Sequence, residues 1–335
     1  MAILPLVSGL AAWQALCVSA QTTQPVQNKE TTGPVRRASL AAWICLLIVY
    51  VVWGSTYLAI RVGVETMPPL MMAAARQLVA GLIMFPLALR HWRSAPLARR
   101  WPSRREWLGC AAVGILLLVA NGVVGVGEKT VPSGLAALLV ATVPLWLLGV
   151  DAGLNHARIG LAPLAGLLLG LVGVALLSGL GGGSRGNSVA GVIVILAAAA
   201  TWALGTILAR RATIPSSAAL TSGMELLAGG AALLVLGAAA GEFGSLHLSH
   251  VSTRSWLALG YLTVVGSIVA FSAYGIALRA LPTATVATYA YVNPVIAVLL
   301  GALILNERLT PATIAGGVLI VGAVVLVVRR SPPAH

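Results

Sequence analysis

Two charged residues, Arg76 and Glu225, lie well inside long apolar stretches of the chain. Ionised side chains are costly within a membrane, so these two are the first candidates for carrying ions or protons. Their positions place them ~9 Å and ~12 Å below opposite surfaces of a ~30 Å apolar layer. Because this leaves them at different heights, we expect separate partners or water rather than a direct ion pair. For Glu225, a structural role bonded to a neighbouring helix is equally compatible with the sequence.

The densest group of polar and aromatic residues in any apolar stretch surrounds Pro294. Tyr and Asn side chains offer hydrogen bonds and flat contact area, which suit an amphipathic solute. Tyrosines can instead form an aromatic belt at the membrane surface, but these lie several residues inside the segment, which favours the lining of a cavity. Other stretches carry the same chemistry. We predict a substrate-binding site drawn from Trp53, Ser55, Thr56, Tyr57, Asn121, Trp202, Thr206, Ser272, Tyr274, Tyr289, Tyr291 and Asn293.

Two prolines, Pro144 and Pro294, lie in the middle of apolar stretches. Each lacks the N–H that would bond the carbonyl four residues earlier, at Val140 or Ala290. Free carbonyls within a membrane are tolerated against protein or a wet cavity. We therefore predict that both prolines form hinges along a substrate path, although a static packing kink would give the same pattern.

Catalytic and cofactor-binding patterns are not found in the sequence. The five histidines fall in predicted loops or the tail, and neither a His-Glu-x-x-His nor a Gly-x-Ser-x-Gly motif occurs. The three cysteines, Cys17, Cys45 and Cys110, have no metal-ligand or disulfide spacing and are interpreted as packing residues. We predict no catalytic residue, no metal site and no cofactor, and therefore no enzyme.

The elements that position these residues follow from the composition. Of 335 residues 59% are apolar and only 9% charged, against about 25% charged in soluble domains, and the mean hydropathy is +0.97. The fold class is therefore an all-α integral membrane protein, because unbroken apolar runs exclude the alternation of barrel strands. Ten transmembrane helices are predicted at 41–60, 70–89, 107–127, 133–152, 161–180, 189–209, 217–239, 256–278, 283–304 and 311–328.

The net charge of +13 is explained by topology rather than by nucleic acid. Placing both termini in the cytoplasm puts fifteen Lys and Arg residues in the inner segments and five in the outer ones, as the positive-inside rule requires. The charged residues Asp151, Glu128, Arg61 and Arg210 fall near segment ends, where we expect them to extend to the membrane surface.

Residues of the two halves match at an offset of 149 to 150 positions. Trp53 matches Trp202, and Trp107 matches Trp256. Pro132 and Pro144 match Pro282 and Pro294. Five helices per copy make the second copy enter from the opposite face, which predicts two inverted five-helix repeats, a pattern typical of secondary transporters.

The stretches that carry this repeat resemble those of a known family. WGSTYLAIRVGVETMPPL, VPSGLAALLVATVP, TYAYVNPVIAVLLG and LNERLTPATIAGGV are similar to the drug/metabolite transporter (DMT) superfamily, in particular its EamA-type ten-helix exporters and their YedA-like branch. The resemblance implies a bacterial inner-membrane location, and a cavity lined by the first, third, fourth, sixth, eighth and ninth helices. The chain departs from the family pattern at one point. Glu307 is the acidic residue of the joint Asn306-Glu307-Arg308-Leu309-Thr310, but the equivalent joint of the first half, His156-Ala157-Arg158-Ile159, has Ala157 in its place.

We therefore expect a secondary transporter that exports small metabolites, amino-acid-like or amphipathic drug-like solutes by alternating access. Uptake by the same fold is the nearest alternative, and a membrane-embedded enzyme a more distant one. The expected partners are a small-molecule substrate and the lipid bilayer, with a homodimer left open. The domains are predicted as a poorly ordered N-terminal extension (1–40), two EamA repeats (41–180 and 181–330) and a cytoplasmic tail (331–335).

Overall fold

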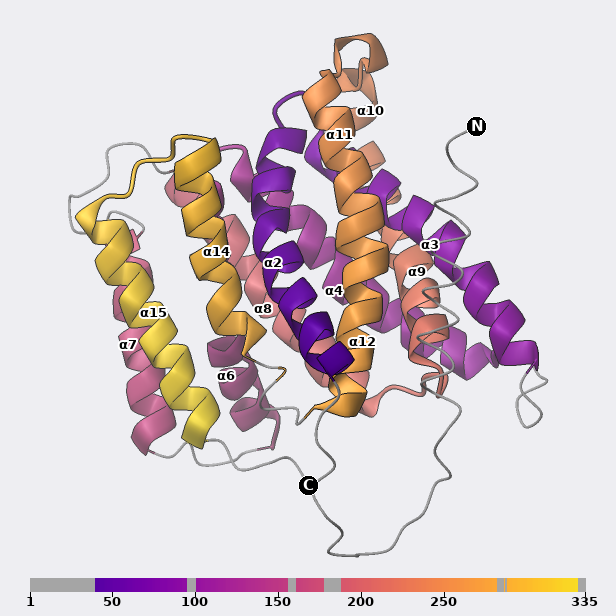
Figure 1. The fold of residues 1–335 in the computed structure, drawn as a ribbon, viewed down its shortest axis with the longest axis horizontal. Helices are drawn as coiled ribbons and strands as arrows, with labels where there is room; N and C mark the ends of the chain where they lie inside the picture. The colour runs from indigo at the N-terminus through magenta and orange to yellow at the C-terminus, as the bar shows by residue number, and fades with distance from the viewer. Residues whose placement is uncertain are drawn as a thin grey trace, which may run out of the picture.

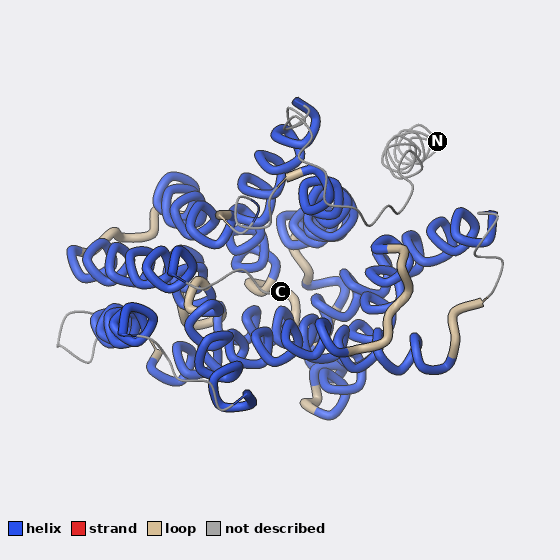
Figure 2. The backbone as a smooth tube through the Cα atoms, turned by 90° about the horizontal axis from the view of Figure 1, so that it is seen from below, coloured by secondary structure: helices blue, strands red, loops and turns tan. Residues whose placement is uncertain are grey.

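The structure, a computed structural model, describes residues 40–94, 101–155, 161–177, 188–281, 286 and 288–330. Throughout these residues the chain forms helices and loops, and no strand occurs among them (Figure 2). The predicted all-α membrane fold is therefore confirmed. The N-terminal extension and the tail proposed from the sequence lie outside the described residues, except for Leu40.

The helices follow the predicted segments closely (Figure 1). Those of the first half are α2 (Leu40–Gly63), α3 (Pro69–Ser94), α4 (Arg104–Glu128), α5 (Ser133–Val140), α6 (Val143–Asn155) and α7 (Leu161–Leu177). Those of the second half are α8 (Val189–Arg211), α9 (Ala218–Ala239), α10 (Glu242–Ser245), η1 (Leu248–His250), α11 (Thr253–Tyr261), the π-helix η2 (Leu262–Val269), α12 (Ala270–Ala280), α14 (Tyr289–Ile304) and α15 (Pro311–Arg330).

Six helical segments of the described chain are long and apolar enough to cross a membrane. They comprise α2, most of α3, α4, α8, α9 and the continuous run from α11 to Tyr274. Shorter apolar helices at Ser133–Leu147, Val292–Ile304 and Pro311–Ala323 complete the set. Within the described residues each of the ten predicted segments contains helix, and the fourth is interrupted at residues 141–142.

The fourth segment is two helices rather than one, because the chain turns at Ala141 and Thr142. The N–H of Thr142 donates to the carbonyl of Leu139 at 3.1 Å, so this bond spans three residues where an α-helix spans four. The hydroxyl of Thr142 donates to the same carbonyl at 2.6 Å. Pro144 follows as the second residue of α6. Since Pro144 has no N–H, the α-helical ladder cannot continue through this point.

Equivalent helices of the two halves pack against each other in opposite directions. The backbone of α3 lies close to glycines of α9, with Gly237 beside Met71, Gly230 beside Leu78 and Gly223 beside Phe85. The equivalent helices α7 and α15 also pack against each other. In addition, α4 packs on α8, and their equivalents in the other repeat, α12 and α2, pack on each other in the same way. Because helices that match at a constant offset run antiparallel, the two repeats are inverted.

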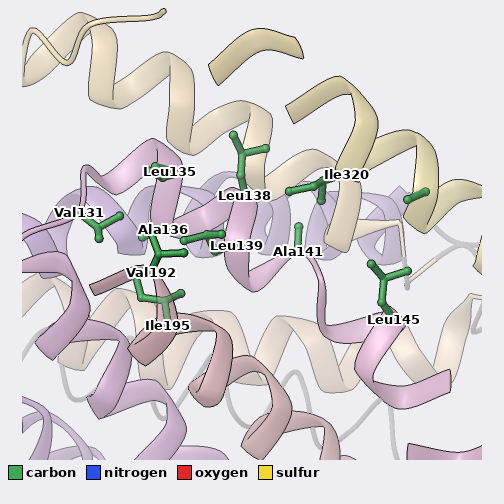
Figure 3. Packing of buried hydrophobic residues seen from close by; sticks show 11 residues of the cluster. Val131, Leu135, Ala136, Leu138, Leu139, Ala141, Leu145, Val192, Ile195 and Ile320 are labelled. Atoms are coloured by element: carbon green, nitrogen blue, oxygen red, sulfur yellow. The ribbon is translucent and has the colours of Figure 1, made fainter. Parts of the chain in front are cut away.

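The buried core runs along the contact between the repeats. Residues of α5 pack on Val192 and Ile195 of α8 and on Ile320 of α15 (Figure 3). These side chains are at most 5% exposed. The half-helix α5 is therefore held by both halves of the molecule. In Figure 1, α2 begins and α15 ends at the lower side, while the α2–α3 connection and α10 lie at the upper side.

Candidate functional site

A buried polar cluster surrounds Arg76 of α3. Its Nε donates to the hydroxyl of Ser267 at 2.9 Å, and its Nη1 donates to the side-chain oxygen of Asn121 at 3.2 Å. The Ser267 hydroxyl also lies 3.5 Å from the Oε1 atom of Gln77. Arg76 is only 4% exposed and Gln77 only 1%. Three helical segments, α3, α4 and η2, therefore meet at this guanidinium.

The π-helix η2 explains how Ser267 reaches Arg76. π-Helices are rare and often mark functional sites, because the extra residue per turn re-aims the side chains. Gly266, next to Ser267, leaves room for the guanidinium: a Cβ there would lie 3.3 Å from Nη2 of Arg76 and 3.3 Å from Cγ2 of Thr56. In the sequence Ser267 lies in an apolar stretch. The α-helical periodicity of that stretch does not predict a π-helix, and so does not predict that Ser267 faces Arg76.

Arg76 is bonded to neutral groups. Among the described residues no carboxylate forms an ion pair with it; its hydrogen-bond partners are Ser267 and Asn121. The half-buried Glu225 packs its backbone against Gly114 of α4 instead. The two charges that share the repeat offset therefore have separate surroundings. A guanidinium carries five N–H donors, so Arg76 retains capacity for a further anionic partner.

An aromatic cluster, formed by Trp53, Phe271, Tyr274 and Tyr289, lies on α2, α12 and α14. The ring of Trp53 is 5.5 Å from Phe271, 5.0 Å from Tyr274 and 5.1 Å from Tyr289, measured between centroids. Two of these contacts are edge-on, a favoured geometry between aromatic rings. Three of the four were predicted as substrate-binding residues, and Phe271 was not.

Polar groups fasten the α14 side of the aromatic cluster. The hydroxyl of Tyr50 lies 2.5 Å from that of Thr288. With its amide oriented to donate, Asn293 places its nitrogen 3.2 Å from the carbonyls of both Tyr289 and Tyr50. Asn293 is 7% exposed, so this amide holds the start of α14 against α2. Tyr50 was not among the predicted residues.

The polar and aromatic clusters are neighbours. Thr56, beside Gly266 and Arg76, donates to the carbonyl of Trp53 at 2.6 Å, one turn along α2. Phe271 follows Ser267 by about one turn, or ~6 Å at 1.5 Å per residue. One end of the combined site is thus cationic and the other aromatic. We call it the central site: Arg76, Asn121, Ser267, Trp53, Phe271, Tyr274 and Tyr289.

The remaining predicted residues lie outside the central site or form hydrogen bonds with the backbone of their own helix. Tyr57 and Trp202 pack with Val140 in a separate apolar cluster between α2, α4 and α8. The hydroxyls of Thr206 and Ser272 donate to backbone carbonyls of their own segments, at 2.9 Å and 2.8 Å. The side chain of Tyr291 lies outside the described part.

Ser55 lies on another face of α2. Its hydroxyl is 2.6 Å from that of Tyr261, and both residues line a shallow groove beside α11. The structure therefore separates Ser55 from Trp53 and Arg76, although the three were predicted to serve one site.

The two hinge candidates lie in different surroundings. Pro144 is half-buried directly after the turn between α5 and α6. Pro294 is buried and lies inside α14, six residues after the turn at Thr288. Pro144 therefore lies beside a break in the fourth segment, whereas Pro294 lies within a continuous helix. The motion of both prolines stays a prediction.

Two acidic residues, Glu128 at the end of α4 and Glu307 in the connection between α14 and α15, have contacts that the sequence did not indicate. Glu128, expected to extend to the surface, is 0% exposed, so that prediction is wrong. Its backbone carbonyl accepts a hydrogen bond from Nη1 of Arg61. Glu307 accepts hydrogen bonds from the backbone N–H of Ser133 at 2.7 Å and of Gly134 at 3.1 Å. Both contacts depend on neighbouring helices, which a position near a segment end cannot reveal.

The central site offers groups that can bind a small molecule. Within the described ranges, no three His, Cys, Asp or Glu side chains gather as metal ligands would. Cys45 and Cys110 are buried free thiols in apolar surroundings. An enclosed cation beside an aromatic wall can bind an amphipathic anion or zwitterion.

Known proteins match this chain along most of its length. A model described as the EamA-like transporter family matches residues 40–179 and 189–329. The uncharacterized inner membrane transporter YedA of Escherichia coli (strain K12) is 39% identical over 297 residues, covering 87% of this chain and 92% of its own. A probable amino-acid metabolite efflux pump of the same organism is 30% identical over 288 residues, covering 83% and 91%.

A solved crystal structure shares the fold. It superposes with a TM-score of 0.56 at 22% sequence identity, covering 88% of this chain and 99% of that chain. At this identity the likeness concerns the arrangement of helices alone.

Proposed function

Because this chain belongs to the EamA-like transporter family, we propose that it exports small amino-acid-like or amphipathic solutes across the bacterial inner membrane. Transport proceeds by alternating access, with the central site exposed to one face and then to the other. The names of two relatives support this proposal, one an inner membrane transporter and the other a probable amino-acid metabolite efflux pump. Both termini lie in the cytoplasm, in agreement with the excess of Arg and Lys in the inner segments.

The observation that carries the proposal is the buried guanidinium of Arg76. It is 4% exposed, and its described partners, Ser267 and Asn121, are neutral. A charge in the membrane interior is stabilised by pairing, and guanidinium and carboxylate match each other in shape. The carboxylate of an amino-acid-like solute supplies the missing negative charge.

The aromatic cluster receives the apolar part of the same solute. Trp53 and Phe271 each lie about one helical turn from the residues around Arg76, so a solute of a few carbon atoms reaches both ends. The rings contribute contact area without demanding one particular side chain. The proposed substrates are therefore small molecules with an anionic head and a variable apolar body.

Alternating access is supported by the inverted repeats and by two prolines, one after a helix break and one within a helix. The turn before Pro144 and the buried Pro294 lie on segments that both repeats pack against. Bending at these points moves α5 and α14 without breaking regular backbone hydrogen bonds, because proline has removed those bonds already.

Export is tested with the full chain reconstituted in liposomes that are loaded with radiolabelled L-amino acids. We expect efflux of at least one amino acid above protein-free liposomes, and a loss of apparent affinity in Arg76→Gln. Losing a charged hydrogen-bond partner costs about 1.5–3 kcal/mol, or roughly ten- to hundredfold in affinity. The exposed Arg254 provides a matched control as Arg254→Gln.

Two results would contradict the proposal. If no amino acid leaves the liposomes faster than from the protein-free control, the substrate class is wrong. If Arg76→Gln and Arg254→Gln bind the transported amino acid equally well, the assignment of the carboxylate to Arg76 is wrong. Expression in whole bacterial cells then decides direction, since an exporter lowers the internal amino acid concentration and an uptake permease raises it.

A further inference from the structure

The carboxyl group of Glu128 is enclosed and unpartnered. Glu128 is 0% exposed at the end of α4, and neither of its carboxyl oxygens has a hydrogen-bond partner among the described residues. The nearest bonded cation, Arg61 of α2, donates to the backbone carbonyl of Glu128 rather than to its side chain. The guanidinium therefore lies beside the acid without a hydrogen bond to either carboxyl oxygen.

An ionised carboxylate cannot remain in such a place without compensation. Removing an unpaired carboxylate from water is far more costly than protonating it. The geometry is that of a neutral acid, whose proton makes a counter-ion unnecessary. Arg61 is consequently free to satisfy the end of α4.

The surroundings admit a proton but not a solute. α8 packs closely on the end of α4, where Ile195 and Gly191 lie against Gly127. The complete enclosure of Glu128 leaves no surface for a molecule to contact. A solute cation would have to displace this packing, whereas a proton needs only transient access of water.

The titratable and charged groups around Glu128 come from several elements. Arg61 and Tyr57 face it from α2, and Glu307 acts on it from the connection between α14 and α15. Lys129 follows in the chain and is exposed, and Gly191 and Ile195 of α8 carry no charge. Glu307 is bonded to the start of α5. Arg61 is therefore the partner that an ionised Glu128 would take.

We propose that Glu128 is a proton-binding residue through which a proton gradient drives this transporter, a role that rests on the proposed function. One proton from water at the upper face binds a carboxyl oxygen when the repeats part there. The same proton leaves to water at the opposite face after the repeats have rocked. The carboxylate left behind pairs with the Arg61 guanidinium, which gives up the backbone carbonyl, and rebinding of a proton reverses this exchange.

Infrared spectroscopy tests the proton itself, without any solute. The purified full chain in nanodiscs is titrated with buffer, and the carbonyl stretch of a protonated carboxylic acid is recorded. We expect a band in the wild type that is lost in Glu128→Gln and displaced, but retained, in Glu128→Asp. Glu65→Gln is the control, because Glu65 is an exposed acid on the same side. A band that persists in Glu128→Gln would overturn the proposal.

Transport by the liposomes tests the coupling. With a transported amino acid as the probe, an imposed pH gradient should accelerate efflux from wild-type and Glu65→Gln liposomes. Glu128→Gln should lose that acceleration while still exchanging labelled for unlabelled amino acid, which shows that the variant is folded. Acceleration that survives in Glu128→Gln and is lost in Glu225→Gln would assign coupling to Glu225 and overturn the proposal.

Failure of the two ideas gives different results. If the wild type moves no amino acid, the proposed function and the coupling role both fall, while the infrared band still decides whether Glu128 holds a proton. If amino acids move but the gradient has no effect on the wild type, export stands and the coupling role is excluded.

Discussion

The carboxylate of Glu307 accepts hydrogen bonds from both the backbone N–H and the hydroxyl of Ser133, at 2.7 Å and 2.8 Å, across 174 residues of sequence. Gly134 donates to the second carboxylate oxygen at 3.1 Å. An acid from the second repeat thus caps the first turn of a half-helix in the first repeat, where the helix dipole favours negative charge. The corresponding position of the first half, Ala157, carries no acid and lies outside the described residues.

Replacing this acid should loosen the junction between the repeats. Glu307→Gln keeps the shape but removes the charge, and hydrogen bonds to charged groups contribute about 1.5–3 kcal/mol. We expect a decrease of that order in the free energy of unfolding, measured by detergent titration of the purified protein. Glu65→Gln should be neutral. Equal stability of the two variants would show that the cap contributes nothing.

Gly301 of α14 provides space for the same cap. A Cβ at this position would overlap the Glu307 carboxylate and approach the Ser133 hydroxyl to 3.0 Å. Gly301→Ala should destabilise the protein by about 1–3 kcal/mol through overpacking. At Gly322 nothing lies within 4 Å of an added Cβ, so Gly322→Ala is the matched control. The same titration compares them, and a stable Gly301→Ala would argue against a fixed carboxylate.

Ser267 should act by positioning the Arg76 guanidinium. Ser267→Ala removes the partner of Nε, and losing one hydrogen bond of about 1 kcal/mol corresponds to roughly a fivefold weaker apparent affinity for the transported amino acid. The maximal rate should change less, because Asn121 still holds the other end of the guanidinium. Ser272→Ala is the control, since that hydroxyl bonds only the Ile268 carbonyl of its own segment. Equal affinities would exclude the positioning role.

Pro144 should affect movement more than binding. Pro144→Ala restores the backbone N–H that can bond the carbonyl of Val140 and straighten the break between α5 and α6. We expect a slower maximal rate of amino acid exchange in liposomes, with the apparent affinity little changed. The substitution should leave the stability equal or higher, which detergent titration checks. An unchanged rate would favour a static kink.

The aromatic cluster should set the preference for the apolar part of the solute. Trp53→Ala removes three ring contacts. Aromatic pairs contribute about 0.5–1.5 kcal/mol each beyond their buried area. We expect weaker competition by bulky amino acids in the exchange assay, and little change for small ones. A uniform loss for every amino acid would indicate a structural role instead.

Part of the central site could be predicted from the chain alone. Arg76, Asn121, Trp53, Tyr274 and Tyr289 stood out because polar and aromatic groups are rare among so many apolar residues. Ser267 was missed, since only a π-helical turn directs it toward Arg76. Ser55 was misplaced for a related reason. A helix period shows which residues share a face but not which neighbour that face meets.

The sequence by itself determined the membrane class, the ten helical segments and the repeat, because these depend on local hydropathy and on matches at a constant offset. The tertiary structure alone decided which charges are enclosed. Glu128 and Arg61 both fall near helix ends, where extension to the surface was expected, yet the packing of α8 on α4 encloses Glu128 completely. Burial and pairing arise from contacts between helices far apart in the chain, which no local pattern encodes.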